Sequence, residues 1–204
     1  MTVDQHLKYR MDHRTREEFQ TDISQFTEME FYWGIALRFE LTRRGHPCSI
    51  EEHGVDNTGR LIEGRLPNHN ADKLYHFLDG SESMKVEIKT IPEKCNRYHT
   101  LKVSAIKGCW DQGARILVPK SGVYWMYGRG AFEWIMDRCD EREDIKDFGY
   151  DPCYRLSMSL VRKMISDGLI IERKWTQPAR KFISEMSHIL LAERKTNRFA
   201  RARR

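Results

Sequence analysis

Two acidic residues and a lysine near the middle of the sequence could together form a reactive centre. The stretch from Met84 to Thr90 alternates polar and apolar residues, which is typical of a β-strand with one buried face. In such a strand Glu87 and Lys89 project to the same side, about 7 Å apart along the chain. Asp72 lies just before a second stretch of strand composition, and the residues between the two stretches have turn chemistry. A β-hairpin would therefore bring Asp72 beside Glu87.

The chemistry expected of this group depends on a metal ion. Converging carboxylates repel each other, and a divalent cation removes that repulsion. Asp72 and Glu87 could hold Mg²⁺, or Mn²⁺ in its place, because Mg²⁺ prefers a few carboxylate oxygens and keeps several waters. The backbone carbonyl of Ile88 would be a further ligand, and Lys89 could orient or deprotonate a metal-bound water and offset the charge of a phosphate. The alternative is a solvated strand face without chemistry, on which alternating charges are ordinary.

The elements that must position these residues can be predicted along the chain. Apolar residues recur at three- and four-residue steps from Asp22 to Arg44, and Gly45 follows, which predicts a helix. Residues 95–113 are predicted to be mostly helical, and the chain from 131 onward mainly helical, with a turn at Gly168 before a short strand over 169–171. The predicted strands are Cys48 to Glu52, Lys73 to Leu78, Met84 to Thr90, Arg115 to Val118 and Val123 to Tyr127. This order predicts an α/β or α+β fold with one main core.

The arrangement of Asp72, Glu87 and Lys89 resembles the Asp…Glu-x-Lys motif of the PD-(D/E)XK nuclease superfamily, and the resemblance covers roughly residues 26–127. It implies a restriction-endonuclease-like core, in which a helix is followed by a mixed central sheet flanked by helices. The acidic residue is then expected at the start of the second strand and the Glu-x-Lys in the third. The residue before Asp72 is Ala71, which departs from the proline of the motif.

The resemblance also implies further site residues. In the family, an acidic residue on the first helix often joins the metal site, which points to Glu30, or otherwise to Glu28. The helix after the third strand often carries a Gln or Lys that faces the substrate. The residues that could do so here are Lys102, Lys107 and Gln112.

Positive charge gathers at the C-terminal end of the sequence. Residues 173–204 carry ten Lys and Arg against two Glu, a net charge of +8, whereas the first 172 residues carry 25 basic and 28 acidic groups, a net charge of −3. A basic end on a near-neutral body fits a protein whose body does chemistry and whose tail contacts a polyanion. Arg198 and Arg201 are the candidate nucleic-acid contacts in this tail. A solvated terminal helix with a frayed basic end is the alternative.

The function expected from these observations is a metal-dependent nuclease that hydrolyses phosphodiester bonds in DNA, with an endonuclease as the first choice. The alternatives are an exonuclease or junction resolvase of the same superfamily, and a non-catalytic nucleic-acid-binding module on a nuclease-like scaffold. The expected organisation is a charged lead-in over residues 1–20, a nuclease core over 21–130, and a mainly helical extension with a basic end over 131–204 that packs on the core. A homodimer is left open.

The composition excludes several other classes of protein. With 40% hydrophobic and 32% charged residues, the chain is expected to be globular and not disordered. No apolar run approaches the roughly 18 residues of a membrane span, and the N-terminus has no apolar stretch for a secretion signal, so no membrane partner and a cytoplasmic address are expected. Five cysteines without a CxxC pair argue against a structural zinc site or a disulfide framework, and for reduced, mostly buried thiols.

Two further features have a structural and a functional interpretation. His99 could touch a phosphate, although a lone histidine is more often structural. The aromatic residues from Tyr124 to Tyr127 could stack on bases, although a buried strand is the simpler interpretation.

Overall fold

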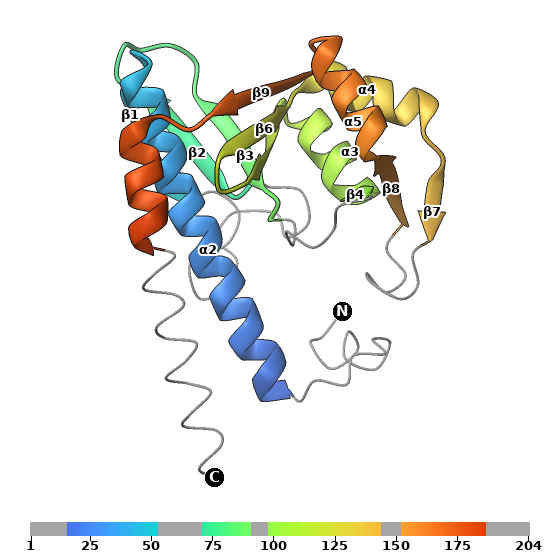
Figure 1. Ribbon diagram of the computed structural model, residues 1–204, viewed down its shortest axis with the longest axis horizontal. Helices are drawn as coiled ribbons and strands as arrows, with labels where there is room; N and C mark the ends of the chain where they lie inside the picture. Colours follow the sequence, from blue (N-terminus) through green and yellow to red (C-terminus); the bar gives the residue numbers. More distant parts are fainter. Residues whose placement is uncertain (1–15, 53–70, 91–97, 144–151, 187–204) are drawn as a thin grey trace.

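A computed structural model describes residues 16–52, 71–90, 98–143 and 152–186 of the chain. Its centre is a six-stranded sheet in the order β1-β2-β3-β5-β6-β9 (Figure 1). The strands are β1 (Cys48–Glu52), β2 (Lys73–Phe77), β3 (Met84–Ile88), β5 (Arg115–Pro119), β6 (Val123–Tyr127) and β9 (Ile170–Lys174). β3 and β5 are parallel, and every other neighbouring pair in this sheet is antiparallel. The fold is therefore mixed α/β with a mostly antiparallel sheet, which is compatible with the α+β class.

The parallel neighbours β3 and β5 are connected by a crossover that contains β4 (Tyr98–Lys102) and the helix α3 (Val103–Asp111). Parallel strands need such a connection, whereas the antiparallel strands β2 and β3 are joined by a short turn. β4 belongs to a second sheet, in which it pairs with β8 (Pro152–Ser157), and β8 pairs with β7 (Glu141–Glu143). The helices α4 (Arg129–Arg138) and α5 (Met158–Ser166) lie on the same side of the molecule as this small sheet (Figure 1).

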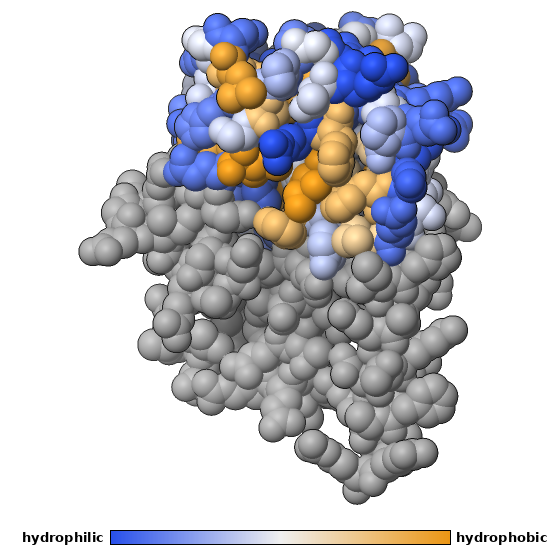
Figure 2. All heavy atoms as spheres, turned by 90° about the vertical axis from the view of Figure 1, so that its left-hand side faces the viewer, coloured by the Kyte–Doolittle hydropathy of each residue, from blue (hydrophilic) through white to orange (hydrophobic). Residues whose placement is uncertain are grey.

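One face of the central sheet is covered by α2 (Arg16–Arg43) and by a helix over residues 177–186, which lie side by side (Figure 1). The core under these two helices includes Leu37, Ile88 and Trp175, each at most 1% exposed. Figure 2 shows this side of the molecule, where patches of hydrophobic side chains lie among hydrophilic ones. The opposite face of the sheet has its own hydrophobic core, which it shares with α3, α4 and α5. The two faces explain the alternation that the sequence shows in β3.

Most of the predicted elements of the first 130 residues are confirmed, with ends shifted by a few residues. The exception is the stretch over 95–113, whose prediction as mostly helical is wrong in its first part, because Tyr98–Lys102 forms β4. The partner of β4 is β8, which begins only at Pro152. A strand whose partner lies so far along the chain has no hairpin signal in its own neighbourhood, and its residues alone do not distinguish it from the start of the helix that follows.

The chain from Ala131 onward contains helices, as predicted, and also strands that the prediction missed. Within the residues that the structure describes, β7 and β8 interrupt the helical region. The strand predicted after Gly168 is present as Ile170–Lys174, and Gly168 has a positive φ of 75°, which glycine adopts at little cost. β8 and β9 complete the small sheet and the edge of the central sheet, so the segment after residue 130 shares sheets with the segment before it.

In the part of the chain that the structure covers, no helix has both the length and the apolar character needed to cross a membrane.

Candidate active site

The hairpin of β2 and β3 places Asp72 beside the end of β3, as predicted. Lys73 pairs with Val86, and this antiparallel register brings Asp72, one residue before β2, to the level of Glu87 and Ile88. There Oδ2 of Asp72 accepts a hydrogen bond from the backbone N–H of Ile88 at 2.6 Å. One carboxylate oxygen thus takes the place of the backbone carbonyl that a longer β2 would supply to this N–H.

Glu87 and Lys89 lie on the face of the sheet opposite α2. Val86 and Ile88 are fully buried in the core under α2, so the alternation of the strand directs Glu87 and Lys89 to the other face. Their side chains form an ion pair in which Glu87 is 14% exposed and Lys89 35% exposed. The backbone N–H of Lys89 donates to the carbonyl of Leu117 in β5 at 2.9 Å, which extends the parallel pairing past the end of β3 and fixes the position of Lys89.

The Asp72 carboxyl is held in an environment that disfavours its charge. Burial raises the pKa of Asp72 well above its ordinary value, and the negative charges of Glu87 and Glu30 raise it further. The positive charge of Lys89 and the hydrogen bond from Ile88 lower this pKa, but they do not cancel the rise. At Asp72, burial and two neighbouring carboxylates therefore outweigh the one lysine.

The Lys89 ammonium is stabilised in its charged form. Burial alone would lower the pKa of Lys89, but the carboxylates of Glu87, Asp72 and Glu30 raise it above its ordinary value. Lys89 is therefore a cation at neutral pH in this arrangement.

The helix α2 contributes Glu30 to this electrostatic group. The charge of Glu30 acts on both Asp72 and Lys89, which brings a residue from the first helix together with the three from the hairpin. The four residues that the sequence assigned to catalysis therefore influence one another in the structure. The alternative on the first helix, Glu28, has a side chain outside the described residues.

The residues present fit a Mg²⁺ ion. Among the residues described, no group of three or more His, Cys, Asp and Glu side chains is arranged to hold a metal. Mg²⁺ does not require such a cage, because it usually binds through one or two carboxylates and keeps several waters. Asp72 and Glu87 offer those carboxylates. Burial and, after it, the charge of Glu87 raise the pKa of Asp72, and a divalent cation would favour the charged form of this carboxyl. In a strand the N–H and C=O of one residue point to the same edge, so the carbonyl of Ile88 opens toward the side on which its N–H meets Asp72.

The residues that the resemblance and the basic C-terminal end assigned to substrate contact have partners of their own or lie outside the described residues. Lys107 forms an ion pair with Glu141 of β7 at 3.1 Å. The side-chain amide of Gln112 donates to the carbonyl of Gly108 in its own helix at 3.0 Å. Lys102 is the last residue of β4 and directly precedes α3. Arg198 and Arg201 lie outside the described residues.

The sequence did not single out Cys109 as a neighbour of this site. Cys109 lies on α3, is 4% exposed, and has a pKa raised by burial and by the negative charge of Glu87. The side of α3 that carries Cys109 therefore faces Glu87. A possible signal was the helical spacing of Val103, Ile106 and Cys109, which is the spacing of a buried helix face.

His99 and the aromatic residues of β6 have a structural role in the fold and not a role in contacting nucleic acid. His99 is 1% exposed, packs its ring near those of Trp125 and Tyr127, and has a pKa lowered to about 3 by burial and by Lys120. A neutral, buried imidazole does not contact phosphate. Trp125 and Tyr127 are themselves at most 5% exposed, so they belong to the core and are not available for stacking on bases.

No family model matches this sequence, and no curated protein or solved structure matches the chain.

Proposed function

We propose that this protein is a Mg²⁺-dependent phosphodiesterase that cleaves nucleic acid, with DNA as the first substrate to test. The observation that carries the proposal is the Asp72 carboxyl, which lies beside Glu87 with a raised pKa while Lys89 lies on the same face of the sheet. A fold gains nothing from converging carboxylates, and perturbed pKa values of this kind cluster at functional sites.

The order of the elements supports the same proposal. α2 is followed by β1, by the β2–β3 hairpin, by the crossover with α3 and by the parallel strand β5. The superfamily resemblance implies a helix, then an acidic residue at the start of the second strand, then a Glu-x-Lys in the third strand. Asp72 precedes β2, and Glu87 and Lys89 lie at the end of β3, in agreement with that order.

Each residue of the group would have a distinct part in hydrolysis. Asp72, Glu87 and the carbonyl of Ile88 would bind the ion, and Glu30 would orient water or accept a proton. When bound, Mg²⁺ supplies an acidic centre that activates water and stabilises the negative charge that develops on the phosphate. Lys89 would orient or deprotonate the attacking water and would donate hydrogen bonds to a phosphate oxygen. The basic end of the chain would contact the backbone without reading sequence.

The test is cleavage of supercoiled plasmid and of labelled duplex, branched and single-stranded oligonucleotides, in Mg²⁺, in Mn²⁺ and in EDTA. We expect cleavage with either metal and none in EDTA. Asp72→Asn and Glu87→Gln should abolish cleavage, and Lys89→Ala should slow the chemical step by roughly a hundred-fold or more. Binding of the same oligonucleotides should be retained.

Two matched controls exist in the same hairpin. Lys85→Ala removes a lysine from the same strand and the same face, and Asp79→Asn removes an exposed acid from the connecting turn. Both should cleave as the wild type does. Cleavage by Asp72→Asn at the wild-type rate would show that the metal site is misassigned. Binding without cleavage on every substrate would instead support the non-catalytic binding module.

A further inference from the structure

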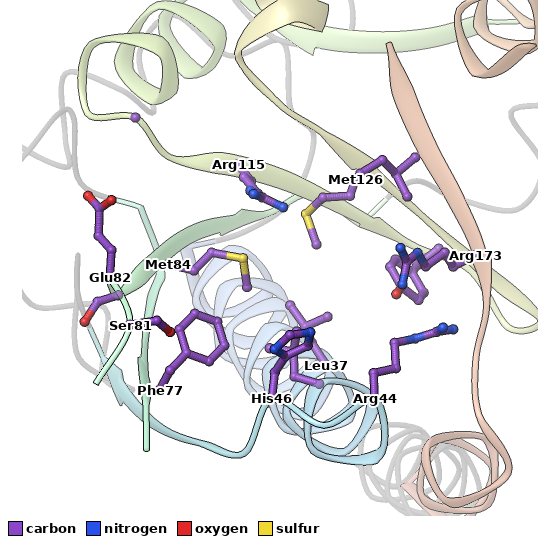
Figure 3. A pocket seen from close by; sticks show the side chains of 15 residues that line it. Leu37, Arg44, His46, Phe77, Ser81, Glu82, Met84, Arg115, Met126 and Arg173 are labelled. Atoms are coloured by element: carbon purple, nitrogen blue, oxygen red, sulfur yellow. The ribbon is translucent and has the colours of Figure 1, made fainter. Parts of the chain in front are cut away.

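A cavity of about 480 Å³ lies at the other end of the sheet (Figure 3). Met84 and Arg115, the first residues of β3 and β5, line it from the sheet. The C-terminal turn of α2 contributes Leu41 and Arg44, and β9 contributes Arg173. Four segments that are distant in the sequence therefore build this cavity together.

The cavity is separate from the candidate active site. Arg115 precedes Ile116, which packs in the core on the α3 side, so the alternation of β5 directs Arg115 to the α2 side. Met84 is on the α2 side for the same reason, because it is two residues from the buried Val86. Glu87 and Lys89 lie on the other face and toward the opposite end of β3, so a ligand in the cavity does not contact them.

Positive charge is concentrated in this cavity. Arg44, Arg115 and Arg173 line it, and among the described residues of its lining Glu82 is the only acidic one. Figure 3 shows Glu82 at the margin with its carboxylate pointing away from the arginines, while Arg44 extends toward Arg173. Within the described residues, Arg115 and Arg173 form neither an ion pair nor a hydrogen bond through their side chains. Among the described residues, the charges of Arg115 and Arg173 are therefore not neutralised by an acidic partner.

Arg44 is held in place by an ion pair with a buried carboxylate. Nε of Arg44 donates to Oε1 of Glu40 at 2.5 Å, and Glu40 has no exposed surface. This contact uses one of the five N–H groups of the guanidinium, and the Arg44 side chain also interacts with Tyr124; the N–H groups that remain can contact a ligand. An arginine fixed by a buried carboxylate loses less conformational entropy when it binds an anion, which is a property of a preorganised site.

Apolar side chains form another part of the wall. Phe77, Met84 and Met126 surround the space between the arginines and Leu37 (Figure 3). Thioether sulfurs and a phenyl ring make favourable contacts with a planar aromatic group. A phosphate dianion offers more acceptor oxygens than a carboxylate does. Several guanidinium groups therefore match a phosphate better than they match a single carboxylate.

We propose that this cavity binds a phosphomonoester that carries a planar aromatic group, as in a nucleoside monophosphate. The phosphate contacts the arginines, and the planar group lies against Phe77, Met84 and Met126. The volume of the cavity is within the range of small-molecule sites, which is roughly 300–1,000 Å³. The phosphomonoester can be a free nucleotide or the phosphorylated end of a nucleic-acid strand, since both present the same chemistry. The proposal does not rest on the nuclease function.

The experiment is isothermal titration of the full-length protein with adenosine 5′-monophosphate, adenosine and inorganic phosphate, all in EDTA so that no metal links the ligand to Asp72 and Glu87. The nucleotide should bind more tightly than adenosine or phosphate alone. Arg115→Gln and Arg173→Gln should each weaken nucleotide binding roughly ten-fold or more, because each removes a charged hydrogen-bond donor. Arg162→Gln removes the same charge from an exposed position on α5 and should bind as the wild type does.

Competition distinguishes the two sources of the phosphate. A short single strand with a 5′-phosphate should displace the nucleotide if the cavity takes strand ends, and the same strand with a 5′-hydroxyl should not. If neither strand displaces it, the ligand is a free nucleotide. The proposal is wrong if adenosine binds as tightly as its monophosphate. It is also wrong if both arginine variants, shown to be folded by thermal unfolding, retain wild-type affinity.

Discussion

Glu40 is a buried acidic residue whose hydrogen bonds allow a quantitative prediction about stability. Its carboxylate has no exposed surface and accepts hydrogen bonds from Arg44 at 2.5 Å, from the backbone N–H of Thr176 at 2.8 Å and from the hydroxyl of Tyr124 at 3.5 Å. These contacts connect α2 with β6 and with the segment after β9. We expect Glu40→Gln to destabilise the protein, because an amide has one acceptor oxygen where the carboxylate has two.

The size of the effect follows from these three contacts. If the amide oxygen of Gln accepts from Thr176, its NH₂ group faces Nε of Arg44, and two donors then oppose each other. The lost interaction is a hydrogen bond between charged groups, worth about 1.5–3 kcal/mol in free energy of unfolding. Arg44 is 34% exposed and can turn toward water, which keeps the cost within this range. For a chain of this size the midpoint of thermal unfolding should fall by roughly 3–12 °C.

The pH dependence provides a second readout of the same contact. Burial works against the charge of Glu40, but the hydrogen bonds from Thr176 and Arg44 outweigh it and lower the pKa below the ordinary value of 4.5. A carboxyl with a lowered pKa stabilises the folded state above its unfolded pKa, and this stability is lost as pH falls through the folded pKa. The difference between wild type and Glu40→Gln should therefore be full at pH 7 and shrink below about pH 4.5.

Urea denaturation at several pH values measures both effects. Glu133→Gln is the matched control, because Glu133 also pairs with an arginine one helical turn away, Arg129, but is 51% exposed. It should shift the midpoint much less than Glu40→Gln does. Equal midpoints for Glu40→Gln and the wild type at pH 7, or a difference that does not change between pH 7 and pH 4, would refute this account of Glu40.

Three other predictions concern the candidate active site and the basic end. Asp72→Asn should have a larger free energy of unfolding than the wild type at pH 7. Because the pKa of Asp72 is raised in the folded state, the wild type loses stability as pH rises above about 3.8. Chemical denaturation should show that the difference between the two proteins vanishes below that pH. Lys89→Arg should fail in the cleavage assay, because a guanidinium is larger and planar; recovery of cleavage would show that Lys89 acts only as a positive charge. Deletion of residues 194–204 removes six basic residues. Each lost phosphate contact should lower the slope of log affinity against log salt concentration by about 0.9 on duplex DNA. An unchanged slope would exclude a role of this segment in binding.

The candidate active site could be predicted from the sequence because its geometry is local. The alternation around Glu87 and Lys89 determines the face to which they point, and the short turn before β3 determines that β2 is its antiparallel partner. The register of this pairing then places Asp72 beside Glu87. Glu30 required the resemblance in addition, because nothing in its neighbourhood on α2 shows that it lies near the hairpin.

The features that the sequence did not predict all depend on contacts between distant segments. β4 is a strand because β8 pairs with it, and the arginine cavity exists because Arg44, Arg115 and Arg173 come together from α2, β5 and β9. In the sequence each of these arginines is one of many basic residues. No local pattern shows that Arg115 and Arg173 will form no ion pair among the described residues after folding.

The surroundings of Asp72 and Glu40 have opposite effects on the pKa of the two carboxyls. Both are acidic residues largely withdrawn from water, and the sequence alone does not distinguish them. Glu40 receives donors from three segments, and its pKa is lowered, so the fold gains stability from its charge. Asp72 receives one backbone donor and faces other carboxylates, and its pKa is raised, so the fold loses stability from its charge. A carboxylate whose charge costs stability calls for another reason for its presence, and the proposed binding of a cation at the end of the hairpin would supply that reason.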